Sequence, residues 1–560
     1  MSLNFIDFEV YYEDWLCVII NPQRRSETVI VNDAGKLKQY YHQHKNEIFV
    51  GFNIRQYDQY IFKGLLLGFN PKDVNDWIVV KHRMGWQFTD LFRNVNINIF
   101  DVMIGFHGLK TLEGFMGNDI KESGVDFNLD RKLTTEEIRK TIEYCRNDVQ
   151  QTMQIFLKRK AEFDAHMSMI KAFNLPLNLI SKTKVQLSAV ILNAVKQKRD
   201  DEFDLEYPHS LKLEKYHEVK RWYDNPVNRN YEKSLKIDIA GVPHIFAWGG
   251  LHGARNNYIE EGQFLNVDVA SYYPSLMIKY GWGSRNMTDP KKYEEIYHQR
   301  LKYKAEKNPL QAPLKIVLNG TYGAMKDKFN PLYDPRQSNN VVVGGQLLLL
   351  DLIEKLEGRC DIVQSNTDGI LVKLRNNREQ VEAICHEWEE RTGMVLEFDE
   401  FVKVIQRDVN NYIIVAADGS YKSKGAVVKK QDALDYDTAI LNEAVIKYFV
   451  DGIPVEKTIR ECNELIKFQK IVKISGSYEH ALHGNEKLND KTLRVFASND
   501  LRDGGVFKVK KGGNPEKFAN TSTNCFILND DINGMKVPDK LDRDFYISMA
   551  KRNVNQFVGR

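Results

Sequence analysis

The sequence predicts a multidomain protein of the α/β and α+β classes. Three observations predict it. The chain has 560 residues, which corresponds to about four units at roughly 150 residues per domain. Strand-like and helix-like apolar patterns alternate along its first segment, and a second strand-rich region begins near residue 241. With 42% hydrophobic and 28% charged residues, the composition excludes a disordered or fibrous chain.

The first segment has strand-like runs and helical runs in a mixed order. We expect strands at Asn4–Val10, Trp15–Ile20 and Glu47–Phe52, and helices at Gln56–Leu67 and Thr134–Phe163. These elements define a first domain at residues 1–165. The following residues 166–235 are polar and helical and end in a loop-rich cluster at 223–230, which indicates a connection.

The second region predicts a core sheet with a helical insertion. Charged helical patterns cover Pro290–Lys307 and Pro313–Met325, and strands resume at Asp361–Leu374 and Phe401–Ala417. Beyond it, residues 429–560 contain no repeat or low-complexity tract. Their lysine-rich stretch Val506–Gly513 is suited to gripping a nucleic-acid backbone.

Charge and cysteine content narrow the class of protein. The net charge is only +3, so a polyanionic partner would need a local basic groove rather than a basic surface overall. The six cysteines include no CxxC pair, which argues against a disulfide scaffold and against a cysteine-ligated zinc or iron–sulfur site. A reducing cytosol fits this pattern best.

No segment of the sequence predicts export or membrane insertion. The acidic N-terminus lacks a basic segment followed by an apolar run. The longest apolar stretch, Val341–Leu350, is interrupted by two glycines and a glutamine and is far shorter than the ~20 residues that span a bilayer. We therefore expect a soluble, cytoplasmic protein with no membrane partner.

Two acidic residues in the second region are candidates for a shared metal pair. Asp268 ends an apolar strand, and Asp368 lies in a tight turn between two apolar runs, as at a hairpin tip. Carboxylates that converge from different elements can hold two divalent ions for an in-line phosphoryl displacement. Each acid alone more often caps a turn.

Three cationic and two neutral polar residues lie between these two acids in the sequence, on two predicted helices. On a helix, Lys315, Asn319 and Tyr322 project from one face, and Arg300 and Lys304 share a face of the preceding helix. Such cations can hold a triphosphate, although Arg300 and Lys304 also fit a solvated face beside nearby glutamates. The pattern KxxxNxxYG at residues 315–323 is expected by chance on the order of once in several hundred such chains.

The first domain carries a second set of acids. Asp7 and Glu9 lie two positions apart on a predicted strand and therefore share a face, as two metal ligands must. Asp58 ends the segment 53–58, which begins with an asparagine. Tyr144 and Asp148 are one helical turn apart, so the tyrosine hydroxyl could orient a metal-activated water.

These motifs, in this order, resemble those of family B DNA polymerases. Residues 268–275 resemble the first polymerase motif (DxxSLYPS), residues 315–323 the second (KxxxNxxYG) and residues 366–368 the third (DTD). Residues 7–9, 53–58 and 144–148 resemble the three acidic motifs of the family's proofreading nuclease (DxE, NxxxFD, YxxxD). Residues 247–250 resemble the YxGG element, and Tyr412, Lys422 and Lys424 resemble the KxY and lysine-glycine elements. Departures from the usual family residues occur at Tyr272, Ala247, Asn366, Gly369 and Asn410.

The resemblance implies an architecture. A 3′-to-5′ exonuclease of ribonuclease H-like fold would occupy residues 1–165, followed by the helical connection at 166–235. A right-hand polymerase core would then have its palm at 236–289 and 326–428, its fingers at 290–325, and a thumb and C-terminal region at 429–560.

The resemblance also implies roles for individual residues. Asp268, Asp368 and the Val269 carbonyl would hold two Mg²⁺, for which Mn²⁺ can substitute. In the nuclease, two metals would be held by the carboxylates of Asp7, Glu9, Asp58 and Asp148. Tyr144 would lie beside these carboxylates. The nucleotide would be bound by three cations and four further side chains: Arg300, Lys304, Lys315, Asn319, Tyr322, Tyr272 and Tyr273, the last excluding a 2′-hydroxyl. DNA would contact Gly249, Gly250, Tyr412, Lys422 and Lys424.

Spacing predicts how synthesis would start. Lys315 follows Asp268 by 47 positions, and Asp368 follows Tyr322 by 46. Protein-primed members of the family carry an extra subdomain in each interval, for which these intervals are too short. We therefore expect a compact, monomeric, phage-type replicase that extends a nucleic-acid primer on template DNA with dNTPs, in the host cytoplasm if it is viral. It would need a helicase, a clamp or a single-strand-binding protein for long products.

Three alternatives remain open at this stage. One is a protein-primed family B replicase. Another is a nuclease or single-strand-binding protein without polymerase activity, which would not account for KxxxNxxYG between two strand-end acids. The third is an inactive structural homologue, against which the presence of Asp268 and Asp368 argues.

Overall fold

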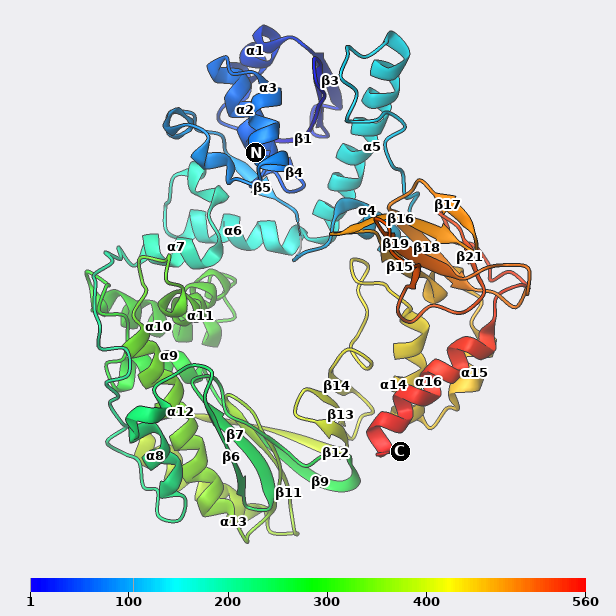
Figure 1. The fold of residues 1–560 in the computed structure, drawn as a ribbon. Coiled ribbons are helices and arrows are strands. Elements are labelled where there is room, and N and C mark those ends of the chain that lie inside the picture. Colours follow the sequence, from blue (N-terminus) through cyan, green and yellow to red (C-terminus); the bar gives the residue numbers. More distant parts are fainter. Residues whose placement is uncertain (1, 104, 560) are drawn as a thin grey trace. The chain divides into compact units, whose positions relative to one another are not determined.

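A computed structural model describes residues 2–103 and 105–559, and the chain folds as two compact units. Figure 1 shows the elements in chain order. Unit 1 comprises Met1–Lys182, Gln431–Ile440 and Glu461–Tyr546, and unit 2 comprises Thr183–Lys430, Leu441–Arg460 and Ile547–Arg560. The mixed α/β content of the prediction is confirmed. The predicted domain boundaries stay predictions, and residues 429–560 are divided between the two units.

Unit 1 is built on a five-stranded sheet of order β3-β2-β1-β4-β5. Its central strand β1 pairs antiparallel with β2 and parallel with β4, and both of its faces are covered by apolar cores. Because side chains alternate along a strand, Phe5, Asp7 and Glu9 share one face and Ile6 and Phe8 the other. The strands are β1 (Leu3–Val10), β2 (Trp15–Asn21), β3 (Ser26–Val31), β4 (Ile48–Gly51) and β5 (Ile99–Asp101).

Six helices accompany this sheet. The longest, α5, contacts β1 and β2 and begins with a capping box in which Thr134 and Glu137 bond each other's backbone. The predicted single helix Thr134–Phe163 is two helices, because the chain leaves helical geometry at Arg159, whose Nη1 donates to the carbonyls of Val102 and Met103. The helices are α1 (Ala34–His44), α2 (Asp58–Leu67), α3 (Pro71–Asn75), α4 (Leu109–Phe115), α5 (Thr135–Lys158) and α6 (Lys160–Ala172); short turns are η1 (Asp76–Val80), η2 (Gly85–Gln87), η3 (Asp90–Asn94) and η4 (Leu177–Ser181).

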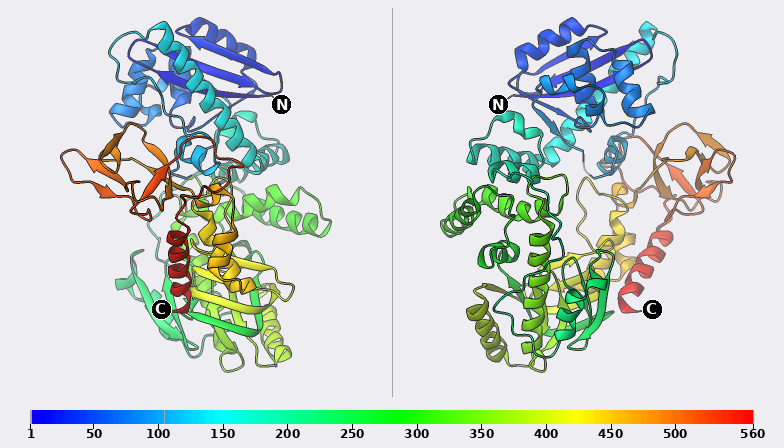
Figure 2. Two further views of the ribbon diagram at one scale, coloured as in Figure 1. Left: turned by 90° about the vertical axis from the view of Figure 1, so that its right-hand side faces the viewer. Right: turned by 60° about the vertical axis from the view of Figure 1, so that its left-hand side comes forward.

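Two small sheets from late in the chain also belong to unit 1 (Figure 2, orange). Their orders are β15-β18-β21 and β17-β16-β19-β20, and they share an apolar core. Ile471 of β15 packs into the core that covers one face of β1, which joins this late segment to the N-terminal sheet. The elements are η6 (Leu465–Phe468), β15 (Lys470–Lys473), β16 (Tyr478–His483), β17 (Glu486–Leu488), β18 (Thr492–Ala497), β19 (Val506–Lys510), β20 (Glu516–Lys517) and β21 (Cys525–Ile527).

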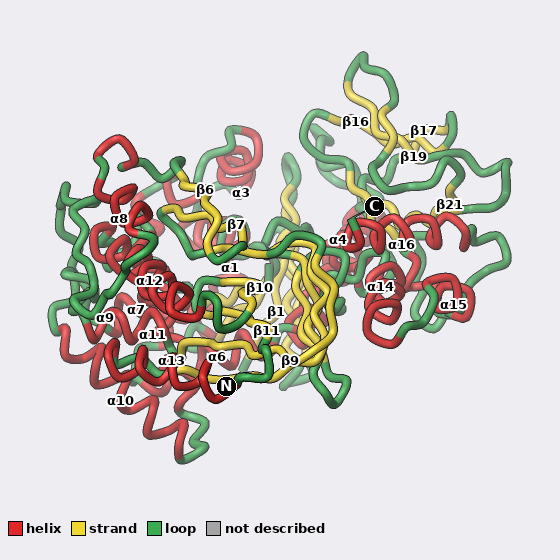
Figure 3. The backbone as a smooth tube through the Cα atoms, turned by 90° about the horizontal axis from the view of Figure 1, so that it is seen from below, coloured by secondary structure: helices red, strands yellow, loops and turns green. Residues whose placement is uncertain are grey.

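Unit 2 is built on a nine-stranded sheet of order β14-β13-β12-β9-β11-β10-β8-β7-β6 (Figure 3). The paired strands are antiparallel, and the two longest, β9 and β12, pair with each other inside the sheet. The strands are β6 (Ser234–Ile239), β7 (Val242–Ala247), β8 (His252–Ala254), β9 (Tyr258–Val269), β10 (Asp361–Ser365), β11 (Gly369–Lys373), β12 (Leu396–Asp408), β13 (Asn411–Val415) and β14 (Tyr421–Lys424).

Helices gather beside this sheet, around the almost fully buried α12. The two predicted insertion helices are α10 and α11, which pack on each other. The helices of unit 2 are α7 (Lys184–Ile191), α8 (His217–Asp224), α9 (Tyr272–Lys279), α10 (Pro290–Ala305), α11 (Gln311–Lys326), α12 (Pro335–Leu356) and α13 (Arg378–Thr392), with the turn η5 (Pro226–Asn228). Three helices cross a boundary between the units along the chain: α14 (Ala439–Asp451), α15 (Val455–Glu461) and α16 (Arg543–Val558).

Among the described residues, no helix combines the length and hydropathy that crossing a membrane requires.

Candidate functional site

The two strand-end acids of unit 2 lie side by side. Asp268, near the end of β9, is paired in register with Gly369 at the start of β11, and the backbone N–H of Val269 donates to the carbonyl of Asp368 at 2.7 Å. Gly369 has no side chain where one would collide, because a Cβ there would lie 1.9 Å from Asp268 Oδ1. The antiparallel register therefore brings two carboxylates from different elements to one point.

Both carboxyl groups are partly withdrawn from water. Burial, reinforced by the charge of Asp368, raises the pKa of Asp268 to about 6, and burial also raises the pKa of Asp368. Asn266 Nδ2 donates to Asp268 Oδ2 at 2.6 Å. A cation shared by these two carboxyl groups would stabilise both of them as anions.

The chain turns sharply after β9. Ser271 has a φ of 51° and precedes α9, whose first residues are the adjacent tyrosines. Tyr272 is buried and donates its hydroxyl to the Gly345 carbonyl at 2.7 Å, whereas the half-buried Tyr273 ring lies 4.3 Å from that of Tyr322 on α11. The two neighbouring tyrosines thus have different surroundings.

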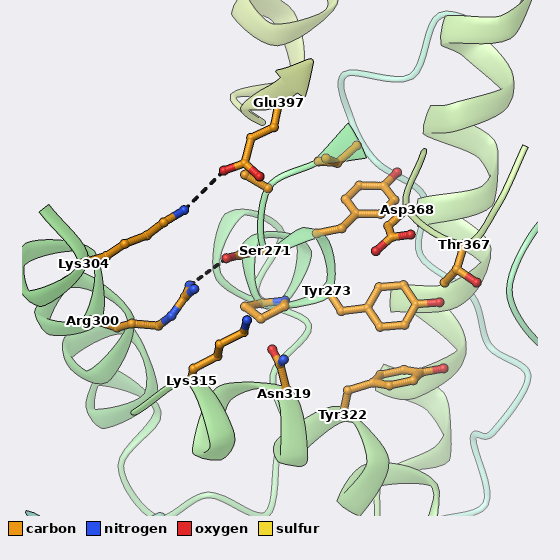
Figure 4. Close-up of a pocket in the computed structure, with 14 residues that line it drawn as sticks. Ser271, Tyr273, Arg300, Lys304, Lys315, Asn319, Tyr322, Thr367, Asp368 and Glu397 are labelled. Atoms are coloured by element: carbon orange, nitrogen blue, oxygen red, sulfur yellow. Dashed lines mark hydrogen bonds and ion pairs between the residues drawn. The ribbon is translucent and has the colours of Figure 1, made fainter. Parts of the chain in front are cut away.

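A cavity of about 420 Å³ opens between α9, α10, α11 and the β10–β11 hairpin (Figure 4). In the figure, Lys315, Asn319 and Tyr322 rise from one face of α11 toward Tyr273 and the turn after β9, as their spacing predicts. The cavity is lined by Val269, Ala270, Ser271, Tyr272, Tyr273, Pro274, Arg300, Lys304, Lys315, Asn319, Tyr322, Thr367, Asp368 and Glu397.

The cations of this cavity differ in how they are held. Arg300 is only 7% exposed; its Nη1 donates to Ser271 Oγ at 2.8 Å, and its buried Nε has no hydrogen-bond partner. Within residues 2–103 and 105–559, no carboxylate forms an ion pair with Arg300. Lys304 Nζ lies 3.2 Å from Glu397 Oε1, and Lys315 is exposed. A buried guanidinium without a carboxylate is unfavourable unless an anion joins it.

A smaller cavity, of about 190 Å³, shares Asp368 with the first and is also lined by Asp268. Tyr412 and Lys422 line it as well. Lys422 Nζ forms an ion pair with Asp399 at 2.7 Å. The strand register places Lys424 opposite Tyr412, although Lys424 does not line either cavity.

The glycine pair at 249–250 is fixed near the hairpin tip. A Cβ on Gly250 would lie 2.4 Å from Thr367 Oγ1, so only glycine allows this close approach. Gln346 of α12 donates its amide to the carbonyls of Ala247 and Gly249 at 2.9 and 2.7 Å. No neighbour comes within 4 Å of a Cβ built on Gly249.

The acids of unit 1 form a separate cluster. Asp7 and Glu9 come from β1, Asp58 from the first turn of α2, and Asp148 from α5. Burial, followed by the charge of Asp148, raises the pKa of Asp7 to about 8, and burial with the neighbouring acids raises those of Glu9 and Asp58. The three separated motifs of the nuclease prediction therefore meet at one place.

Lys110 is a residue of this cluster that the sequence did not indicate. Its Nζ lies 2.6 Å from Asp148 Oδ1, 3.0 Å from Glu113 Oε1 and 4.6 Å from the centroid of the Tyr144 ring. Glu113 is fully buried, and burial raises its pKa to about 7. Both residues are on α4, whose local sequence carries no pattern that distinguishes it from an ordinary amphipathic helix.

Cys145 also touches the cluster. Its Sγ lies 3.7 Å from Asp7 Oδ2, and burial raises the pKa of the thiol, which favours a protonated hydrogen-bond donor over a metal ligand. The ligand atoms of Asp7, Glu9 and Cys145 lie within 4.8 Å of one another. The scattered pattern of cysteines does not single this residue out.

The donors of both sites fit hard divalent ions. All the acids offer carboxylate oxygens, the ligands that Mg²⁺ prefers. In unit 1, buried Asp58 Oδ1 has no hydrogen-bond partner, and Lys110 is the cation that accompanies the four carboxylates. Lys110 supplies a single positive charge beside Asp7, Glu9, Asp58 and Asp148, so bound divalent cations would improve the charge balance of the cluster.

Comparisons with known proteins bear on this arrangement. The chain is 26% identical to DNA polymerase 1 of Saccharolobus solfataricus over 196 residues, which is 34% of this chain and 21% of that one. It is 24% identical to DNA polymerase 1 of Sulfurisphaera ohwakuensis over 195 residues, 34% and 22% of the two chains. The resemblance to family B DNA polymerases is confirmed.

The similarity to these polymerases is partial. It spans about a fifth of the length of the relatives, and no family model matches the chain. A solved structure of the family B DNA polymerase from Pyrobaculum calidifontis aligns with 100% of this chain and 78% of its own, at 14% identity and a TM-score of 0.46. The relatives are archaeal, and the phage-type assignment stays a prediction.

Proposed function

We propose that the chain is a template-directed DNA polymerase that extends a nucleic-acid primer with dNTPs. The single observation that carries the proposal is Arg300, a buried guanidinium that faces a cavity and lacks a carboxylate partner in the described chain. A triphosphate would supply the missing anion. Lys315 and Lys304 line the same cavity and add positive charge where the β- and γ-phosphates would lie.

The acids beside the cavity support phosphoryl transfer. Asp268, Asp368 and the Val269 carbonyl would hold two Mg²⁺, which when bound lower the pKa of the attacking hydroxyl and stabilise the leaving pyrophosphate. The chain itself would orient the nucleotide. Tyr273 and Tyr322 form a ring pair against which the sugar and base would pack, and Asn319 would face the nascent base pair.

The cluster in unit 1 supports a second activity, removal of a frayed 3′ end. Asp7, Glu9, Asp58 and Asp148 would bind two metals, and Lys110 would hold Asp148 in place through its ion pair. Tyr144 lies directly beneath Lys110 and would orient the attacking water. The predicted ribonuclease H-like fold of this unit, and the palm, fingers and thumb of the other elements, belong to this proposal.

A primer-extension assay tests both activities. With Mg²⁺ and dNTPs on a primed template, we expect the primer to lengthen, and without dNTPs we expect it to shorten. Arg300→Met should raise the KM for dNTP at least about tenfold, because the guanidinium would bind the phosphates equally in the ground state and in the transition state. Arg300→Lys should keep part of the affinity. A primer that never lengthens under these conditions would contradict the polymerase proposal.

A further inference from the structure

One surface of unit 1 lies outside both sites and has an unusual composition. Between positions 79 and 91 the chain exposes large apolar side chains by about half or more, and the basic row Lys81-His82-Arg83 is exposed among them. We call residues 79–91 the basic-apolar turn. Its exposed apolar members are Val79 (52%), Val80 (65%), Met84 (56%), Trp86 (57%) and Leu91 (49%).

Hydrogen bonds and ring contacts hold the basic-apolar turn. Trp77 Nε1 donates to the Met84 carbonyl at 3.2 Å, and the Arg83 N–H donates to the Trp77 carbonyl at 3.0 Å. Phe88 packs edge-on against Trp77 and stacks against the buried Phe92. The exposed side chains are therefore presented by an ordered backbone rather than by a loose loop.

The turn is also anchored next to the nuclease cluster. Gly85, the residue before Trp86, lies so close to the Tyr60 ring that a Cβ there would be 2.1 Å from Tyr60 Cδ2. Tyr60 is in the first turn of α2, two residues after Asp58. Trp86 is thus fixed to the helix end that carries one of the four acids.

The charges of the turn select among partners. In the described chain, no carboxylate pairs with Lys81 or Arg83; Lys81 Nζ lies 5.7 Å from the Trp77 ring centroid. The one acid of the turn, Asp90, is paired with Arg93 at 3.1 Å. A single nucleic-acid strand offers a base face for the exposed indole and phosphates for the two free cations, which a neutral apolar partner does not.

We propose that the basic-apolar turn binds single-stranded DNA. Trp86 stacks on a base, and Lys81 and Arg83 neutralise the neighbouring phosphates. The proposal deepens the proposed function and rests on it in one respect: the bound strand is the 3′ segment that leads to the Asp7 cluster. Binding itself requires no hydrolysis, so the two can be tested apart.

Photo-cross-linking tests the contact directly. The full chain is irradiated with a single-stranded oligonucleotide that carries 5-iodouracil, in EDTA so that no hydrolysis occurs, and is then digested with trypsin. We expect the adduct on the peptide Met84–Arg93, which contains Trp86 and is released by cleavage after Arg83 and Arg93. Adducts confined to other peptides would overturn the proposal.

Affinity measurements test the roles of the side chains. In EDTA, Trp86→Ala should weaken binding of oligo(dT) about tenfold, and Trp86→Phe should restore most of the loss because it keeps an aromatic face. Lys81→Ser with Arg83→Ser should lower the slope of log Kd against log salt by about 1.4, or ~0.7 per phosphate.

A matched control distinguishes binding at the basic-apolar turn from the general electrostatic attraction between unit 1 and DNA. Lys45→Ser with Lys158→Ser removes the same charge from exposed positions elsewhere in unit 1 and should leave the slope unchanged. An equal change in both double variants, or a Trp86→Ala variant with unaltered affinity, would refute the site. A chain that binds in EDTA but never degrades 3′ ends in Mg²⁺ would contradict the nuclease proposal and leave the binding site standing.

Discussion

At the scale of single residues, Gly369 shows how a departure from a motif is explained by geometry. The family usually has serine at this position of its third motif, and this chain has glycine. Here the Asp268 carboxylate occupies the space that a Cβ would need, since the two residues face each other across β9 and β11. Glycine at position 369 therefore leaves the space that the Asp268 carboxylate occupies.

This geometry predicts the effect of restoring the side chain. Gly369→Ser should push the Asp268 carboxylate aside and lower the kcat of nucleotide incorporation by roughly a hundredfold, because displacements of about 1 Å cost this much. Degradation of 3′ ends should be unaffected. Gly124→Ala is the control, since no neighbour lies within 4 Å of a Cβ there. A fully active Gly369→Ser enzyme would mean that Asp268 can move without consequence.

At the scale of elements, α4 is held by residues more than 340 positions away in the sequence. Arg494 on β18 is fully buried and donates to the carbonyls of Gly114 and Asn118 at 3.3 and 2.6 Å, and to that of Asp530 at 2.5 Å. Gln469 accepts from its Nε at 2.9 Å and donates to the Phe115 carbonyl. These contacts fix the C-terminal end of α4, the helix that also carries Lys110.

Removal of this guanidinium should loosen α4. Arg494→Met leaves several buried carbonyls without a donor and should destabilise unit 1 by about 3 kcal/mol, or roughly a hundredfold in a local opening equilibrium. Hydrogen exchange measures this at the amides of residues 112–120. Arg494→Lys keeps the charge but not the fork of donors, and an intermediate effect is expected. Unchanged exchange in both variants would show that the late sheets do not hold α4.

At the scale of the whole molecule, the two acid clusters belong to different compact units. Each draws its residues from one unit, since the unit 1 cluster uses β1, α2, α4 and α5, and the unit 2 site uses β9, the β10–β11 turn and α9–α11. The proposed activities should therefore be separable by mutation.

Paired variants test this separation. Asp7→Ala with Glu9→Ala should reduce 3′-end degradation at least about a hundredfold and leave extension intact, because charge stabilisation at one site is lost. Asp368→Ala should do the reverse. Both activities are measured on the same primed template with and without dNTPs. Loss of extension in a folded Asp7/Glu9 variant would contradict the two-site assignment.

The short intervals between the motifs of unit 2 predict how synthesis starts and proceeds. The interval after Asp268 contains α9, α10 and the start of α11, and the interval after Tyr322 contains the end of α11, α12 and β10, so neither holds an additional subdomain. On a nicked duplex at limiting enzyme, we expect only short products without a helicase or clamp. Long displaced strands, or nucleotide attached to a protein primer, would contradict this.

The sequence alone determined what depends on local periodicity. Two-residue spacing put Asp7 and Glu9 on one face of β1, and helical spacing put Lys315, Asn319 and Tyr322 on one face of α11, because strand and helix geometry is repeated at every residue. The strands β1, β2 and β4 and the two insertion helices α10 and α11 followed from the same patterns.

Which distant segments meet is visible only in the folded chain. It brought Lys110 to Asp148, put Glu397 opposite Asp268 in the register of β12 and β9, and placed β15–β21 in the unit that contains the N-terminal acids. These contacts join residues tens to hundreds of positions apart. They arise from the burial of shared apolar cores and from register between strands, which no local pattern in the sequence encodes.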